Sequence, residues 1–360
     1  MQDSESTTAN IGKLRDICYD CLGERVAGAS SAGVFIWAHS AGTFTAARAT
    51  HISGADATSV SWGAPEHGSP LVCGNVDGSI FVWEPNFRVE SDGVEAFSRL
   101  DSSFRVAANG RPISCVRFAP VSGVSSSNSS RFAAGGEDGH VRIYESVFTA
   151  SGAAHTNVVV TTNGGGEGGW QLTQEFETGA GAIITLAWAP GIEKDAPLIA
   201  VACEKSISLW SLTTSTTTTS KLSSWVHVAD LLGAPAPAIT LAWAPRAGRS
   251  TLLLASAGRS HSGKTTDESC IALWRVASEG APIFHPTSLL IGTGAALYVQ
   301  HASDATLAIA PLTLIECGDV GGGGVDCIAF SFEGALIASM RDKENRLTFR
   351  EGPGSVWIQE

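Results

Sequence analysis

Two short patterns in the sequence have the residue types that catalysis or metal binding uses. Cys18 and Cys21 form a CxxC pair, which supplies half of a zinc site or a redox disulfide. The segment AHSAG at 38–42 approaches the nucleophile elbow of hydrolases, with Ser40 as the nucleophile. The zinc site is incomplete, because no second Cys or His pair has zinc-site spacing. The elbow is incomplete, because Ala38 stands in place of its first glycine. We therefore interpret both as turn or core residues.

The acidic and glycine-rich segments are explained in the same way. Asp77, Glu137 and Asp138 have the chemistry of general acids, but each lies in a predicted turn. The run GGGEGG at 164–169 is followed by neither Lys-Ser/Thr nor a helix, so it does not resemble a phosphate-binding loop. The sequence therefore predicts no catalytic, cofactor or metal site, and we expect a protein that is not an enzyme.

Composition and charge narrow the class of protein. Charged residues make up 16% of the 360 residues, and the net charge is −12. No basic stripe is present, which argues against direct binding to nucleic acid or to a membrane surface. No apolar run reaches the length of a membrane span, and the first ten residues lack the pattern of a signal peptide. We expect a soluble intracellular protein that works through other proteins.

An internal repeat determines the predicted fold. Residues 59–84 read as an apolar strand ending in Trp62, a loop, the strand LVCG, an Asp-Gly turn and the strand SIFVW. Alternating apolar residues in such strands place one face against a neighbouring sheet. The same order of strands recurs in six segments, namely 14–38, 59–84, 113–145, 182–210, 238–274 and 325–349.

Aromatic residues occupy equivalent positions in these copies, and we expect them to fill the space between sheets. The first strand of each copy closes on an aromatic residue, and so does the third. The first-strand set is Tyr19, Trp62, Phe118, Trp188, Trp243 and Phe330; the third-strand set is Trp37, Trp83, Tyr144, Trp210, Trp274 and Phe349.

The predicted fold is an all-β, WD-repeat β-propeller with six blades. Stacked sheets bury faces that no sheet could bury alone. We expect residues 1–10 to be a flexible N-terminus and 11–360 to be a single propeller. Asp-Gly at 77–78 and at 138–139 predicts type I′ hairpin turns, and the run 213–220 predicts a surface loop. The apolar insertion 277–312 is either a packed loop or a partner contact.

The segments SVSWGAPEHGSPLVCGNVDGSIFVWE, FAAGGEDGHVRIYE and AWAPRAGRS resemble the small WD-repeat nucleoporins of the Seh type. The sibling family is the small propeller subunit of the COPII vesicle coat. The resemblance spans 11–360 and implies a scaffold in the nuclear pore's Y-shaped complex, at the nuclear envelope, serving transport of protein and mRNA. Its implied partners are an α-solenoid nucleoporin that donates a blade and other pore or coat scaffold proteins. It also implies a second home on vacuole or lysosome membranes, in a TOR-regulating coat-like complex.

The resemblance also implies an open propeller that accepts a seventh blade from the partner. Only residues 1–10 precede the predicted propeller and 350–360 follow its last copy, whereas a further blade needs about 40 residues. We expect strand addition at the seam between the first and sixth blades. Position along the chain places Leu14 and Ile17 on one side of this seam, and Phe349, Val356 and Trp357 on the other.

Some features depart from the family, and two other functions stay open. The first, fourth and sixth copies have SSAG, EKS and DKEN in place of Asp-Gly, and only His51 resembles the buried histidine of many WD repeats. The alternatives are a COPII outer-coat subunit and a WD-repeat adaptor that reads a peptide on its top face. Nuclear-rim staining would favour the pore, and puncta at export sites the coat.

Overall fold

The computed structural model shows that the chain is built from antiparallel β-strands. Among the residues it describes there is no α-helix, only the short 3-10 helix η2 (Pro65–His67). The described residues are 11–38, 50–89, 95–99, 104–105, 110–120, 130–147, 169–190, 197–216, 221–231, 237–246, 251–260, 268–278, 297–300, 306–316, 325–331, 335–340, 346–351 and 357–359.

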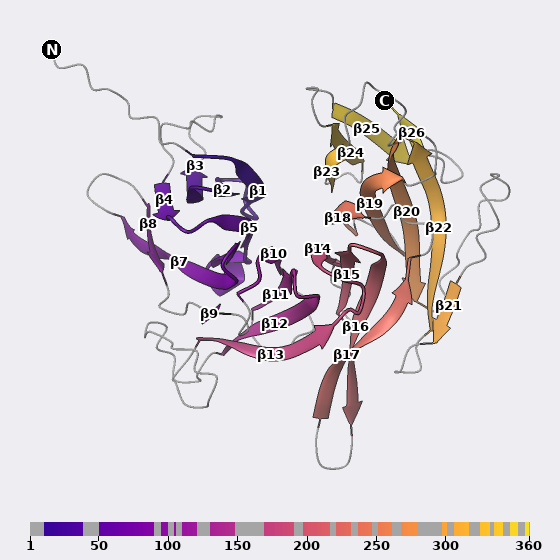
Figure 1. Cartoon of the computed structure of the whole chain (residues 1–360), viewed down its shortest axis with the longest axis horizontal. Coiled ribbons are helices and arrows are strands. Elements are labelled where there is room, and N and C mark those ends of the chain that lie inside the picture. Colours follow the sequence, from indigo (N-terminus) through magenta and orange to yellow (C-terminus); the bar gives the residue numbers. More distant parts are fainter. Residues whose placement is uncertain are drawn as a thin grey trace. The chain divides into compact units, whose positions relative to one another are not determined.

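The chain divides into two compact units, Met1–Glu177 and Thr178–Glu360, each with three sheets among its described residues. Figure 1 shows the strands of each sheet side by side. Many antiparallel sheets of this kind are consistent with a β-propeller. The prediction that 11–360 forms a single propeller stays a prediction.

The first unit contains sheets 1 to 3, and the first strand of each lies at one edge. Sheet 1 consists of β1 (Leu14–Tyr19), β2 (Arg25–Ser30), β3 (Gly33–Ala38) and β4 (Thr50–Ser53). Sheet 2 consists of β5 (Ala57–Trp62), β6 (Leu71–Asn75), β7 (Ser79–Val89) and β8 (Glu95–Arg99), with β9 (Phe104–Arg105) also paired to β7. Sheet 3 consists of β10 (Ile113–Phe118), β11 (Arg131–Gly136), β12 (His140–Val147) and β13 (Gly169–Glu177).

The second unit contains sheets 4 to 6, again with the first strand of each at one edge. Sheet 4 consists of β14 (Ile183–Trp188), β15 (Leu198–Cys203), β16 (Ile207–Thr216) and β17 (Lys221–Asp230). Sheet 5 consists of β18 (Ala238–Trp243), β19 (Leu252–Ser260), β20 (Glu268–Ser278), β22 (Thr306–Glu316) and β21 (Leu297–Gln300). Sheet 6 consists of β23 (Val325–Phe330), β24 (Leu336–Met340), β25 (Arg346–Glu351) and β26 (Trp357–Gln359).

Strand register places the repeat aromatics of each sheet in one row. In sheet 2, for example, Trp62 pairs with Leu71, which pairs in turn with Trp83, so the three residues form one row across the sheet. The other rows are Tyr19–Val26–Trp37, Phe118–Phe132–Tyr144, Trp188–Ile199–Trp210, Trp243–Leu254–Trp274 and Phe330–Leu336–Phe349.

A β-bulge also recurs at one place in the first strand of each of the six sheets. In sheet 2 the register shifts between Ala57 and Ser59, where the strand begins. A bulge adds one residue to a strand and increases its local twist. The corresponding shifts lie at Leu14/Asp16, Ile113/Cys115, Ile183/Thr185, Ala238/Thr240 and Val325/Cys327. Six sheets thus repeat both the aromatic row and the bulge.

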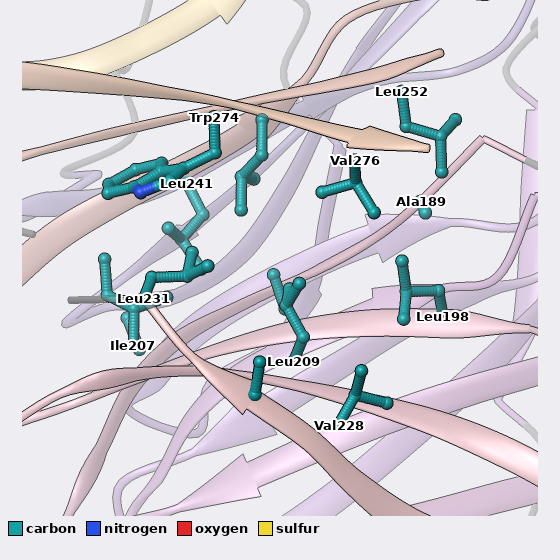
Figure 2. Close-up of a cluster of buried hydrophobic side chains, with 14 of the residues drawn as sticks. Ala189, Leu198, Ile207, Leu209, Val228, Leu231, Leu241, Leu252, Trp274 and Val276 are labelled. Atoms are coloured by element: carbon teal, nitrogen blue, oxygen red, sulfur yellow. The ribbon is translucent and has the colours of Figure 1, made fainter. Parts of the chain in front are cut away.

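Within each unit, sheets pack face to face through apolar side chains. Figure 2 shows the packing of sheet 4 against sheet 5, where Ile207 and Leu209 lie close to Leu241 and Trp274. Between sheets 1 and 2 the buried cluster includes both Trp62 and Trp83. Seven of the predicted repeat aromatics are buried, namely Trp62, Trp83, Phe118, Tyr144, Trp188, Trp210 and Trp274, and Trp37, Trp243 and Phe330 are half-buried.

The predicted type I′ turns are wrong in detail. A type I′ turn needs positive φ at both central residues, but at 77–78 only Gly78 has it, with φ of 80°. Because the Gly78 amide donates to the Asn75 carbonyl at 3.2 Å, the chain forms a four-residue turn that closes on a left-handed glycine. A Cβ on Gly78 would lie 2.7 Å from the Arg111 carbonyl oxygen, which explains why glycine is required there.

Two segments predicted as loop or insertion belong in part to strands. Residues 213–216 continue β16, and Figure 1 shows β16 and β17 extending beyond the other strands of their sheet. The insertion 277–312 supplies β21 and the start of β22, which add to sheet 5. These described residues of both segments are therefore strand and not loop.

Candidate interaction site

Strand β1 exposes three large apolar side chains on one face. Leu14, Ile17 and Tyr19 are 46%, 53% and 56% exposed, respectively. Side chains alternate along a strand, and accordingly Cys18 and Asp16 lie on the opposite face, toward β5. Sheet 1 thus has one face packed against sheet 2 and another face that leaves apolar side chains in water.

The repeat shows that this exposure is exceptional. The residues that correspond to Leu14 and Ile17 in the other first strands are all buried, with at most 9% of their surface exposed. The equivalents of Leu14 are Ala57, Ile113, Ile183, Ala238 and Val325; those of Ile17 are Val60, Val116, Leu186, Leu241 and Ile328. In sheets 2, 3, 5 and 6 these residues pack on the preceding sheet. We call this face of a sheet its acceptor face.

The floor of the sheet 1 acceptor face is closely packed. A Cβ added to Gly28 would lie 2.7 Å from the Trp37 ring and 2.9 Å from the Leu14 side chain, so both cover this glycine. Trp37 stacks on Phe35 with ring centroids 6.2 Å apart. The face is therefore pre-formed before any partner binds.

The expected buried histidine is not found. His51 is exposed, its ring centroid lies 4.7 Å from that of Phe35, and its Nε2 is 3.1 Å from the Ala32 carbonyl oxygen. Its neighbours are a ring and a main-chain oxygen near the β2–β3 turn. His51 therefore does not take the buried role of the histidine in other WD repeats.

A charged pair fixes the opposite side of β1. The Asp16 carboxylate accepts hydrogen bonds from Arg117 Nη1 at 2.8 Å, from Ser59 Oγ at 2.7 Å and from the Val60 amide at 3.1 Å. Burial works against the charged form of Arg117, but contacts with Cys115 and Asp16 raise the pKa of its guanidinium above the usual value. The pair therefore links the first strands of three consecutive sheets.

A second network holds the turn between β1 and β2. The buried Asp20 carboxylate accepts from Arg25 Nε at 2.9 Å and from the Glu24 amide at 2.8 Å. Burial opposes ionisation of Asp20, but these hydrogen bonds outweigh it and lower the pKa of the carboxyl below its ordinary value. Arg25 also lies over the Trp62 ring, 5.0 Å from its centroid, and Leu22 is exposed at the turn.

The structure places the predicted seam residues in two different sheets. Leu14 and Ile17 share the acceptor face of sheet 1. Phe349 and Trp357 belong to β25 and β26 of sheet 6, where Phe349 pairs with Gln359 and Trp357 with Glu351. Val356 lies outside the described residues. The assignment of these residues to a partner seam stays a prediction.

Sequence reasoning missed three residues of this region. It interpreted Tyr19 as a core aromatic, and it assigned nothing to Asp16 or Arg117. A signal for the pair was present, since the position before the closing aromatic carries Arg only in the third copy, and the position of Asp16 is acidic only in the first.

The segments weighed for catalysis and metal binding give no site among the described residues. Cys18 is half-buried, Cys21 is exposed in a turn, and burial raises the pKa of the Cys18 thiol. No group of three metal-ligating side chains occurs in the part of the chain that is described. Ser40 lies outside the described residues. In the same part of the chain, no helix is long and apolar enough to span a membrane.

Residues 104–145 match the family model of the WD domain, G-beta repeat. No curated protein matches the chain. The matched segment contains β9 of sheet 2 and then β10, β11 and β12 of sheet 3. The chain therefore contains a WD40 repeat, which points to a protein-interaction scaffold.

Proposed function

We propose that the protein is a non-enzymatic scaffold that binds a partner by accepting a β-sheet on the acceptor face of sheet 1. The exposure of Leu14 and Ile17 carries this proposal, because the equivalent residues of the other copies are buried, and Tyr19 is exposed beside them. Covering them removes apolar surface from water, which stabilises a complex by about 25 cal/mol per Å² before the costs of association.

The partner's sheet binds through side chains rather than by strand addition. Neighbouring sheets within each unit join through buried clusters such as the one that contains Val60 and Trp62. The same mode on sheet 1 uses Ile17 and Tyr19, which point away from sheet 2. This replaces the expected pairing of backbone edges.

The resemblance of the sequence to Seh-type nucleoporins supports a more specific assignment. In this assignment the partner is an α-solenoid nucleoporin of the Y-shaped complex, and its sheet lies between the first and sixth blades of an open, six-bladed propeller. The resemblance also supports shared use in a TOR-regulating coat-like complex. A COPII coat subunit is the second candidate, because the WGAPEHG loop and the WAPRAGRS loop resemble both siblings.

Affinity capture of the tagged chain from its own cells tests the proposal. We expect large α-solenoid nucleoporins in stoichiometric amounts, and their loss with the double variant Ile17→Lys/Tyr19→Lys. Leu172→Lys is the matched control, because Leu172 is also an exposed leucine of the first unit but lies on β13.

Each result of this capture has a defined meaning. Recovery of coat proteins alone moves the assignment to the vesicle coat. Equal recovery with the double variant and with Leu172→Lys overturns the proposed role of the acceptor face. Recovery of neither class of protein overturns the assignment to pore and coat.

A further inference from the structure

Each sheet that is covered by a following sheet presents a recurring pattern toward it. On sheet 1, small residues of the second strand pair with aliphatic residues of the third strand. We call this second face of a sheet its donor face. The pairs are Ala27–Ile36 and Ala29–Val34 on sheet 1, Ala200–Leu209 and Ala202–Ile207 on sheet 4, Ala255–Leu273 and Ala257–Ile271 on sheet 5, and, with valine in place of the first small residue, Val72–Val82 and Gly74–Ile80 on sheet 2.

These donor residues make the contacts between sheets. Ala200, Ala202, Ile207 and Leu209 are buried in one cluster with Leu241 of sheet 5. Ala255, Ala257, Ile271 and Leu273 are buried with Ile328 of sheet 6. The pattern is therefore the complement of the acceptor face.

A small residue is needed where the donor face of one sheet lies very close to the acceptor face of the next. A Cβ on Gly74 of sheet 2 would lie 2.6 Å from Cγ2 of Ile113, a residue of the acceptor face of sheet 3. Leu14 is the residue of sheet 1 that corresponds to Ile113. A sheet that covers Leu14 at the same distance therefore also needs a small residue at this point.

Sheet 6 departs from the donor pattern. At the same register positions its second and third strands carry the pairs Ile337–Thr348 and Ser339–Arg346. Thr and Arg replace the aliphatic residues that the third strand carries in the other sheets, including Ile143 and Val141 of sheet 3. By residue type, sheet 6 does not match an apolar acceptor face.

We infer that the partner's covering sheet carries a donor face of this chain's own kind, with a small-x-small strand paired to an aliphatic-x-aliphatic strand. This inference rests on the proposed function and names the chemistry of the partner. Small residues of the partner's sheet lie over Leu14, and its aliphatic pair covers Ile17 and Tyr19. The occupant comes from another protein, because the last sheet of this chain lacks the pattern.

A copy of sheet 4 serves as the probe, because its donor face is described in full. Residues 178–236 are fused in place of residues 1–10 of the full chain, so that the copy precedes β1 through its own connecting segment. Ile17→Cys in a Cys21→Ser background reports coverage through the rate at which maleimide modifies the introduced thiol, located by peptide mass spectrometry. The matched control carries a copy of sheet 6, residues 317–360, at the same place.

We expect the sheet 4 copy to slow modification of the introduced thiol about tenfold relative to the unfused chain, equivalent to about 1.4 kcal/mol. The sheet 6 copy should leave the rate unchanged. Ala202→Phe within the sheet 4 copy should restore the fast rate, and Ser223→Phe, at an exposed position of the copy, should not.

The outcomes separate the inference from the proposed function. Equal protection by both copies overturns the donor pattern while the acceptor face stands, and no protection by the sheet 4 copy also overturns the pattern. Slow modification of the introduced thiol in the unfused chain would overturn the proposed function itself. If that slow rate depended on protein concentration, the occupant would be a second copy of this chain.

Discussion

The two units of the molecule join their sheets by different chemistry at one repeat position. Immediately before the closing aromatic, the first strands of the first unit carry Cys18, Ser61 and Arg117. The first strands of the second unit carry alanine at the same position, namely Ala187, Ala242 and Ala329. Ser61 and Arg117 therefore bring hydrogen-bonding groups to this position in the first unit, where the second unit has methyl groups.

In the first unit, hydroxyl groups of β5 bind the backbone of β10. Ser61 Oγ accepts from the Phe118 amide at 3.0 Å, and Ser59 Oγ accepts from the Val116 amide at 3.2 Å. Because the Ala119 amide bonds across to β11, alternate amides of β10 point away from that strand. Serines of one sheet thus satisfy donors of the next.

In the second unit, apolar side chains dominate the packing of sheet 4 on sheet 5. The buried cluster in Figure 2 includes Leu209 and Leu241, and β14 and β18 share the sequence ITLAW. Trp243 adds a polar bond, from its Nε1 to the Ala187 carbonyl at 3.1 Å. The comparison teaches that the repeat sets geometry, whereas the bonding between sheets is free to differ.

The largest loss of stability should come from a substitution in the apolar cluster between sheets 4 and 5. Leu209→Ala removes a fully buried side chain from the cluster between sheets 4 and 5 and should lower the free energy of unfolding by about 3 kcal/mol. Denaturant unfolding measures this loss, and Leu172→Ala, at an exposed leucine, is the control. Similar losses for both variants would break the apolar account of the second unit.

Breaking the ion pair between Arg117 and Asp16 should lower the stability somewhat less. Arg117→Met leaves the partly buried Asp16 carboxylate without its cation, which should cost about 2 kcal/mol in denaturant unfolding. Arg15→Met, which breaks the more exposed pair with Asp56, should cost less than about 1 kcal/mol. Equal costs for the two variants would show that Arg117 acts as a surface charge.

The aromatic rows could be predicted from the sequence, but the Asp16–Arg117 contact could not. Local patterns predicted the aromatic rows, because alternation and strand-ending aromatics depend on neighbouring residues. They did not predict the contact of Asp16 with Arg117, because it joins strands of different copies across an intervening sheet. Exposure of Tyr19 was missed for a related reason, since the repeat assigns it to a core and only the order of sheets leaves it uncovered.

Low pH should destabilise the first unit through protonation of Asp20. The folded-state pKa of Asp20 lies below its ordinary value of 3.8, so its stabilisation is complete above that pH and is lost as pH falls through the folded value. Asp20→Asn should therefore cost about 1 kcal/mol near neutral pH, with the deficit shrinking below pH 3.8. Unfolding titrations at several pH values measure it, and a deficit independent of pH would contradict this assignment.

The smallest changes in stability should have opposite signs at two buried serines, one in each unit. Ser256 is fully buried in sheet 5 and its hydroxyl has no hydrogen-bond partner among the described residues, so Ser256→Ala should stabilise by up to about 1 kcal/mol. Ser61→Ala should instead destabilise by about 1 kcal/mol, because the Phe118 amide loses its acceptor. Paired thermal melts would show one variant above the parent and the other below.

The stagger of the WD40 match against the sheets has a consequence for synthesis on the ribosome. The matched segment begins with β9, which pairs within sheet 2, and ends with β12 of sheet 3. A nascent chain that has just completed β7 still lacks β9, which pairs with it, until the matched segment starts to emerge from the ribosome. The segment 104–145 therefore adds a strand to sheet 2 before it builds sheet 3, so that during translation sheet 2 is completed first.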